Sequence, residues 1–124
     1  MGRGKVAGDV PEEIVRAAMA EPALRGRVVL CSTRRVRLLC DGECVGFVTP
    51  HETASGWRAG PIYVVPEHRG HGHVEAFYAS HPDRAWVAFV PDGARGSLAM
   101  HKRAGFVEWK GARNGRWMRR EVIQ

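Results

Sequence analysis

The chain has 124 residues, 44% of them hydrophobic and 26% charged, which is the composition of one globular domain with a modest core. Its formal net charge of +6 favours an anionic ligand or partner, without specifying nucleic acid. No apolar run is long enough to span a membrane, and no apolar signal core follows the basic N-terminus. We therefore expect a cytoplasmic protein without membrane contact.

The first half of the chain predicts one helix followed by strands. Residues 1–8 are rich in glycine and are expected to be flexible. A helix is predicted over 11–20, with Asp9 as its cap. Strands are expected over residues 28–31, 35–40 and 43–49. Asp41-Gly42 predicts a tight hairpin between the last two strands, and the polar residues 50–58 predict a loop.

The second half alternates between strands and helices. Strands are predicted over 62–65 and 85–90, with a helix over 73–80 between them, and this order favours a parallel crossover. A helix over 95–104 should end at Gly105, with Phe106 making the apolar contact of a Schellman motif. A final hairpin is expected around Asn114-Gly115. The order of elements predicts a mixed α/β fold in a single domain over residues 1–124.

Three cysteines, Cys31, Cys40 and Cys44, lie in or beside the apolar strand-like runs. We interpret them as small, reduced core residues. A zinc site built on them would need a fourth ligand and usually has a closer cysteine pair. The sequence therefore predicts no metal at these positions.

The stretch from Ile62 to Val74 predicts an anion site. Pro66 ends a strand, because proline has no N–H for a ladder. Gly70 and Gly72 carry no Cβ and let the backbone approach a ligand closely. A helix that begins near His71 would aim its free N–H groups at that ligand, which is most often a phosphate. The guanidinium of Arg69 adds positive charge.

Three histidines, His68, His71 and His73, surround these glycines and raise the alternative of a metal site. Their spacing fits neither a helical pair four residues apart nor a tight knuckle of the CxxC kind. We rank a metal below phosphate and expect no metal here. The imidazoles of His71 and His73 would either donate to the phosphate or be solvated.

Three segments, in this order, resemble the GNAT superfamily of acyl-CoA-dependent N-acyltransferases. The run Val64-x-Pro66-x-x-Arg69-Gly70-x-Gly72 looks like the pyrophosphate-binding motif of that family. The run Ser97-x-x-x-His101-x-x-x-Gly105-Phe106 is similar to its later helix and Gly-Phe ending. The hairpin that ends in Val45-Gly46-Phe47 looks like its second and third strands. The resemblance implies a mostly antiparallel sheet with a central splayed pair of parallel strands, flanked by helices.

The resemblance also implies an acetyltransferase that uses acetyl-CoA (or another acyl-CoA) and acylates a primary amine by direct attack. The backbone of Val64 and Val65 would bind the pantetheine arm and polarise the thioester. The pyrophosphate would be cradled by the backbone N–H groups of Arg69, Gly70, His71, Gly72, His73 and Val74. Ser97 would also contact CoA. His101 stands where the family most often has the tyrosine that protonates the CoA thiolate, and histidine can donate a proton near neutral pH.

Departures from the family pattern keep other functions open. Val74 replaces a small residue, Ala94 replaces a frequent asparagine, and His101 replaces the tyrosine. A degenerate module that binds CoA or nucleic acid without catalysis is therefore the alternative. His101 could equally be a surface histidine, with water protonating the thiolate. Candidates for a general base are His51, Glu52 and Tyr63, each of which could instead be a loop or packing residue.

The C-terminal hairpin is basic and interleaved with Trp109 and Trp117. Its cations are Lys110, Arg113, Arg116, Arg119 and Arg120. Such a patch can hold a phosphodiester backbone, so the acceptor amine could be carried by a nucleic acid or nucleotide. The alternative is a solvated hairpin with its tryptophans packed inward. The excess of arginine argues against a strongly cationic acceptor. Because the N-terminal part is short, the acceptor pocket should be open or completed by a second copy in a homodimer.

Overall fold

The computed structural model describes residues 9–21, 24 and 35–123. The predicted strand over 28–31, with Cys31, lies outside the described residues. The chain forms two compact units, one of residues 1–50 and 60–73 and the other of residues 51–59 and 74–124. Among the described helices, none combines the length and the apolar character needed to cross a membrane.

The first unit contains a three-stranded antiparallel sheet in the order β1-β2-β5. Its strands are β1 (Val36–Cys40), β2 (Glu43–Val48) and β5 (Tyr63–Val64). The predicted hairpin between β1 and β2 is confirmed, with Asp41 at φ 52° and Gly42 at φ 82°. Positive φ at both residues is what a tight two-residue turn requires, and Asp-Gly supplies it readily.

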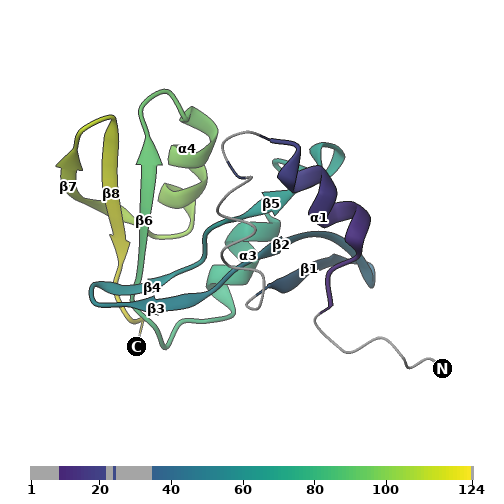
Figure 1. Cartoon of the computed structure of the whole chain (residues 1–124). Coiled ribbons are helices and arrows are strands. Elements are labelled where there is room, and N and C mark those ends of the chain that lie inside the picture. The colour runs from purple at the N-terminus through teal and green to yellow at the C-terminus, as the bar shows by residue number, and fades with distance from the viewer. Residues whose placement is uncertain (1–8, 22–23, 25–34, 124) are drawn as a thin grey trace. The chain divides into compact units, whose positions relative to one another are not determined.

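Helix α1 (Glu12–Met19) lies against this sheet (Figure 1). Its buried residues Ile14 and Ala18 form a core cluster with Phe47 of β2 and Tyr63 of β5. Their spacing of four residues puts both on one face of the helix. The N-cap is Pro11, without a side-chain capping bond, rather than the expected Asp9.

The second unit contains a five-stranded sheet in the order β3-β4-β6-β8-β7. Its strands are β3 (His51–Thr53), β4 (Gly56–Arg58), β6 (Trp86–Pro91), β7 (Val107–Ala112) and β8 (Gly115–Arg120). The predicted loop over 50–58 is wrong, because it forms the β3–β4 hairpin. Thr53 Oγ1 donates to the Gly56 carbonyl at 2.6 Å and closes the turn. The hairpin at Asn114-Gly115 is confirmed.

Strand β6 is the buried centre of this unit. It pairs in parallel with β4, through Trp57 and Trp86, and antiparallel with β8. The expected partner over 62–65 instead pairs antiparallel with β2. Trp86, Val87 and Val90 are at most 1% exposed, as the apolar run predicted. The fold class is confirmed: a mixed α/β fold, mostly antiparallel, with one parallel pair among the described strands.

Helices α3 (His73–Ala79) and α4 (Arg95–Arg103) follow β5 and β6 in the chain (Figure 1). The rings of Phe77 and Tyr78 pack edge-on against Trp86, with centroids 5.5 and 5.3 Å away. A short 3-10 helix, η3 (Pro66–His68), precedes α3. Gly105 has φ 95°, and its N–H donates to the Lys102 carbonyl at 3.1 Å. The predicted Schellman ending of α4 is therefore confirmed.

Candidate functional site

The predicted site residues fall in both units. The first unit holds Val64, Val65, Arg69, Gly70, His71, Gly72 and His73, and the second holds Val74, Ser97 and His101. The first set forms a strand end and a loop, and the second lies on α3 and α4.

The loop between η3 and α3 has an alternating backbone. Gly70 has φ 79° and Gly72 has φ 83°, whereas the residues beside them do not have positive φ. A Cβ built on either glycine would meet no atom within 4 Å. The glycines are therefore needed for their left-handed backbone conformation, and space is not the constraint. Alternation of right- and left-handed residues turns successive N–H groups toward one side, which makes an anion-binding concavity.

The N–H groups of Gly70, His71, Gly72 and His73 have no acceptor in the part of the chain that the structure describes. The Arg69 N–H, in contrast, donates to the Pro66 carbonyl at 3.3 Å. The row of available donors thus begins one residue later than the sequence predicted. Four neighbouring N–H groups can together hold one anionic group with several oxygens, such as a phosphate.

The side chain of Arg69 is turned back toward its own unit. Its Nε donates to the Val64 carbonyl at 2.7 Å, and its Nη2 pairs with Glu21 at 2.8 Å. The guanidinium also lies over the Tyr63 ring, 5.5 Å from the centroid. In this conformation Arg69 braces strand β5, and its side-chain charge is not directed by a contact within the loop.

The two valines of β5 differ in what their backbone can offer. The Val65 N–H donates to the Val45 carbonyl at 2.9 Å and is therefore occupied within the sheet. Because successive N–H groups of a strand point to opposite sides, the Val64 N–H points away from β2. Of the predicted pair, only Val64 has its N–H directed out of the β2–β5 ladder.

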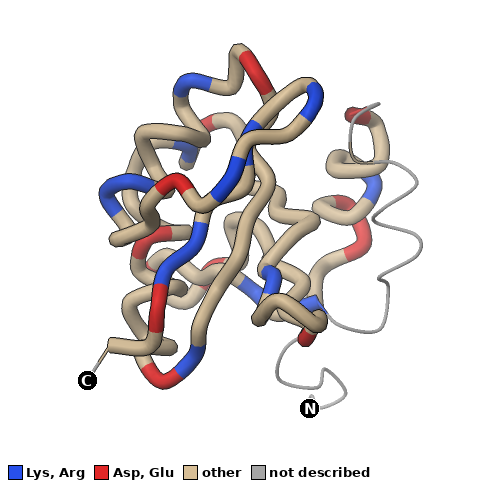
Figure 2. Tube along the Cα trace, turned by 90° about the vertical axis from the view of Figure 1, so that its left-hand side faces the viewer, with Lys and Arg blue, Asp and Glu red and all other residues tan. Residues whose placement is uncertain are grey.

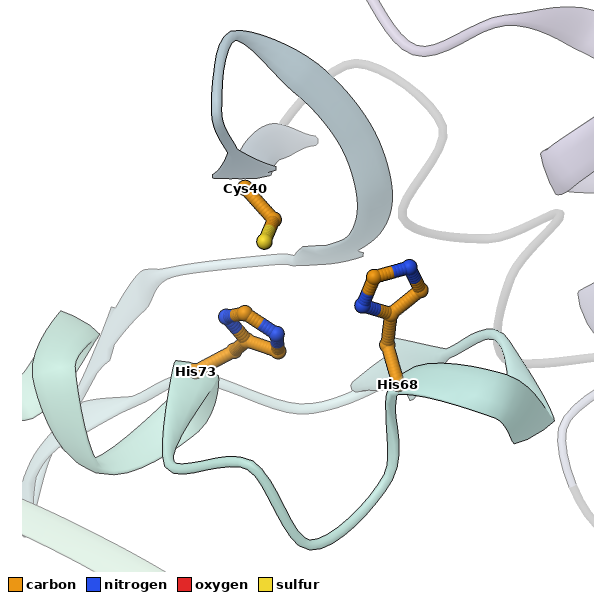
Figure 3. Close-up of side chains that lie close together, drawn as sticks. All are labelled: Cys40, His68 and His73. Atoms are coloured by element: carbon orange, nitrogen blue, oxygen red, sulfur yellow. The ribbon is translucent and has the colours of Figure 1, made fainter.

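A cluster that the sequence did not predict lies beside this loop. Cys40, His68 and His73 bring one ligand atom each to within 4.8 Å of one another (Figure 3). The predicted histidine group is thus only partly brought together with a thiol, because His71 is exposed. The sequence signal was the position of Cys40 at the end of a strand, which gives no partner without knowledge of the fold.

On α4, His101 is 3% exposed and is held by its own helix. Its Nδ1 lies 2.7 Å from the Ser97 carbonyl oxygen, which can only accept, so Nδ1 carries the proton. The Ser97 hydroxyl lies 3.3 Å from the same nitrogen. The Nε2 atom is buried and lacks a partner among the described residues. In the neutral ring Nε2 is therefore an acceptor.

The pKa of His101 is lowered below 6.5, chiefly because burial penalises the charged ring. The Ser97 hydrogen bond and the carboxylate of Glu75 oppose this shift without reversing it. A neutral ring at physiological pH, with its proton on the side of Ser97, is poorly placed to donate a proton. The acid role expected for His101 is not favoured by this geometry.

Two departures from the motifs have simple structural positions. Val74 is 7% exposed, so its side chain faces the interior and leaves only its N–H for a ligand. Ala94 is the N-cap of α4, with φ −82° and ψ 69°, and provides no side-chain cap. The candidate bases are separated in the fold, since His51 and Glu52 lie on β3 and the buried Tyr63 on β5.

The arginines of the C-terminal hairpin are largely used within the protein. Arg119 pairs with Glu121 at 2.9 Å, and Arg116 lies 3.8 Å from Asp92. Arg120 is buried and donates to the carbonyls of Tyr78 and His81, each at 2.7 Å. Along these strands basic segments are interspersed with acidic ones (Figure 2). The hairpin therefore does not present an uninterrupted cationic stripe.

A cavity of about 300 Å³ opens on the same unit. It is lined by Thr53, Ala54, Ser55, Arg58, Val87, Trp109, Lys110 and Trp117. Trp109 is 38% exposed, and the Arg58 guanidinium lies 5.0 Å from the Trp117 ring centroid. Two indoles and two cations, with no carboxylate in the lining, suit an aromatic or anionic group. The sequence missed the contribution of the β3–β4 hairpin, because it assigned that segment to a loop.

No protein-family model and no curated protein sequence matches this chain. Solved structures do match it in fold. An acetyltransferase from Bacillus subtilis, solved in complex with CoA, has a TM-score of 0.74 at 9% identity, over 96% of this chain and 97% of its own. A GNAT-family acetyltransferase from Bacillus cereus ATCC 10987 has a TM-score of 0.72 at 13% identity, over 90% and 88%.

A third structure, the ribosomal-protein-S18-alanine N-acetyltransferase from Escherichia coli, has a TM-score of 0.62 at 12% identity. It is matched over 97% of this chain and 94% of its own. At such identities the likeness establishes the arrangement of the backbone and leaves the chemistry open. The chain has the fold of the GNAT acetyltransferases.

Proposed function

We propose that this chain is an N-acetyltransferase that moves an acetyl group from acetyl-CoA to a primary amine. The observation that carries the proposal is the row of N–H groups from Gly70 to His73, which lack acceptors among the described residues. A pyrophosphate has the charge and the number of oxygens to use them. The likeness in fold to an acetyltransferase solved with CoA supports the same ligand.

Within the first unit, the loop N–H groups would bind the pyrophosphate and the Val64 N–H would bind the pantetheine arm or the thioester oxygen. A hydrogen bond to that oxygen stabilises the negative charge that develops during attack. Val65, Val74 and Ser97 remain sequence-based candidates for CoA contacts. Arg69 would contribute by holding β5 in place through the Val64 carbonyl.

The reaction is a direct displacement. The amine nitrogen attacks the thioester carbon, the carbon–sulfur bond breaks, and CoA leaves as a thiolate. The amine nitrogen then loses one proton and the thiolate gains one. Because His101 is neutral and its proton faces Ser97, we assign protonation of the thiolate to solvent. His101 would instead position the end of α4.

A non-catalytic module that binds CoA or nucleic acid is the alternative, together with an acyltransferase whose amine acceptor is carried by a nucleic acid. The cavity with Trp109, Trp117, Arg58 and Lys110 is the observation that favours this class of partner. Aromatic rings in such a cavity would stack on a base, and the cations would contact phosphate.

Thermal unfolding in the presence of acetyl-CoA, CoA and ATP tests the proposal first. A ligand present at one hundred times its Kd stabilises the fold by about 2.7 kcal/mol. We expect such stabilisation from both CoA species and less from ATP. Release of free thiol from acetyl-CoA with a panel of amines then tests turnover.

The outcomes separate the hypotheses. Absence of stabilisation by CoA would refute the enzyme and the CoA module together. Stabilisation without thiol release on any amine would favour the non-catalytic module. Binding of single-stranded DNA that persists at moderate salt would favour the nucleic-acid class, because purely electrostatic association is lost there.

A further inference from the structure

We propose that Cys40, His68 and His73 form a Zn²⁺ site. Cys40 is the last residue of β1, His68 the last of η3, and His73 the first of α3. All three belong to the first compact unit, and each is half-buried. In Figure 3 the sulfur of Cys40 and a nitrogen of each imidazole face the same space.

The separations of the donor atoms are close to those of a metal centre. The three ligand atoms lie within 4.8 Å of one another. A tetrahedral zinc ion with Zn–S of about 2.3 Å and Zn–N of about 2.0–2.1 Å holds its ligand atoms roughly 3.3–3.6 Å apart. Closure by about 1 Å is therefore required, and rotations of three side chains can supply it without moving the strands.

The hydrogen-bonding state of the histidines favours a cation between them. His68 Nδ1 and His73 Nε2 are both buried and have no hydrogen-bond partner among the described residues. A buried polar atom without a partner destabilises a fold by about 1–3 kcal/mol. The ring centroids of the two histidines lie 5.6 Å apart. A metal ion bound by both nitrogens would remove two such penalties at once.

The donor set selects the metal. One thiolate and two imidazole nitrogens suit a borderline divalent ion such as zinc. The cluster contains no carboxylate, so it does not suit Ca²⁺ or Mg²⁺, which prefer oxygen ligands. Cys40 is a free thiol and can ionise to bind the metal. Three protein ligands leave the fourth position of the ion to water.

The proposal departs from the expectation that these histidines bind no metal. That expectation considered only their spacing along the chain, and Cys40 approaches from another strand. His71 is exposed and is not a member of the close group. The other described cysteine, Cys44, lies with its Sγ 3.3 Å from the Gly46 carbonyl oxygen. His71 and Cys44 are therefore matched controls for the ligands.

The site would fix both ends of the loop from Arg69 to Gly72, because its histidine ligands flank that loop. His73 can serve both purposes, since its side chain would bind zinc while its backbone N–H faces the loop. If the loop binds the CoA pyrophosphate, as the proposed function holds, a nearby dication would strengthen that binding. This last consequence rests on the proposed function, whereas the metal site itself does not.

Zinc titration of the tag-free, reduced, chelator-treated chain, in the absence of CoA, tests the site. We expect about one equivalent of Zn²⁺ to bind and to raise the unfolding temperature. Substitution with Co²⁺ should give the sulfur-to-metal charge-transfer absorption of a thiolate ligand. Absence of that absorption, or absence of stoichiometric binding, would overturn the proposal.

Variants assign the ligands. Cys40→Ser, His68→Ala and His73→Ala should each weaken Zn²⁺ binding by at least about 10–100-fold, the loss that even an outer-shell partner causes. Cys44→Ser and His71→Ala should retain full affinity and the cobalt spectrum. Equal losses in the control variants would show that the metal is held elsewhere. If a ligand variant is unfolded, the zinc-dependent shift of the wild type and of Cys44→Ser still decides the question.

The two proposals fail separately. Zinc binding without CoA binding would leave the metal site standing and refute the acetyltransferase. CoA binding to a chain that takes up no zinc would do the reverse.

Discussion

The loop from Arg69 to His73 and the segment from Ser97 to Phe106 were both singled out by the sequence as parts of one site, yet their polar groups are in opposite states. In the loop, four N–H groups and two nearby histidine nitrogens lack partners among the described residues. At the end of α4, the Gly105 and Phe106 N–H groups donate to helix carbonyls at 3.1 and 2.9 Å. His101 Nδ1 is bonded to Ser97 as well.

The difference separates binding from support. Buried or clustered polar groups without partners are costly, and they persist where a ligand completes them. Groups that are already satisfied hold the backbone in place and need no ligand. We therefore expect substitutions in the loop to change ligand affinity, and substitutions in the α4 segment to change mainly stability.

The largest effect is expected at Phe106, on the satisfied side of the comparison. This ring is 2% exposed and packs against Tyr78 and His101, with centroids 4.9 and 5.0 Å away. Phe106→Ala should lower the free energy of unfolding by about 3–5 kcal/mol, measured in urea. Phe106→Leu should cost clearly less. A loss below about 1 kcal/mol for the alanine variant would show that this end of α4 is not part of the core.

The next effect is expected in the loop. Gly72→Ala places a Cβ at φ 83°, so the loop should relax and misalign its N–H groups. CoA should bind at least about tenfold more weakly, which corresponds to about 1.4 kcal/mol, with a stability loss of about 1 kcal/mol. Calorimetric titration with CoA measures the first quantity and urea unfolding the second.

Gly42→Ala is the matched control for that variant. Gly42 has φ 82° and open space around its Cβ position, but it lies in the β1–β2 turn. We expect the same loss of stability and unchanged affinity for CoA. Equal losses of affinity in both variants would mean that backbone strain anywhere in this unit weakens binding, and the loop would lose its special role.

Local patterns predicted the parts of this fold that short segments determine. The Asp41-Gly42 turn needs only two residues that tolerate positive φ. The end of α4 needs only a glycine followed by an apolar residue, and Gly105 and Phe106 supply them. The anion loop was found for the same reason, since its glycines and their neighbours are consecutive.

The sequence could not predict features that depend on contacts between distant segments. Cys40 meets His68 and His73 only after β1 and the loop are packed in one unit. The parallel partner of β6 is the three-residue strand β4, which is too short to show a periodic pattern. The role of His101 depended on which of its nitrogens carries the proton, and the Ser97 carbonyl decides that only in the folded helix.

The burial of His101 makes a prediction about pH. Its pKa in the folded chain is below 6.5, its value when unfolded, because burial penalises the charged ring. As the pH falls through 6.5, the unfolded chain takes up a proton that the folded chain refuses. Stability is therefore complete above pH 6.5 and is lost between 6.5 and the lower folded pKa.

His101→Asn should remove this acid-induced loss while reducing stability at neutral pH. Urea midpoints of both proteins, measured from pH 7.5 down to pH 5, give the comparison. Thiol release by the folded variant should keep its dependence on pH if solvent protonates the thiolate. Loss of turnover confined to high pH, with the fold intact, would instead restore His101 as the acid.

The smallest effect is expected at the start of α4, where the satisfied segment has an uncapped end. Ala94 occupies the N-cap and has no side-chain acceptor for the first-turn N–H groups. Ala94→Ser supplies a hydroxyl oxygen within one turn of the Ser97 N–H and should raise stability by roughly 0.5–1 kcal/mol. The change in urea midpoint measures this gain, and affinity for CoA should not change. A variant with unchanged stability would show that ψ 69° at this position turns the side chain away from the helix. A variant with altered CoA affinity would place the start of α4 among the ligand-binding groups and remove the contrast with the loop.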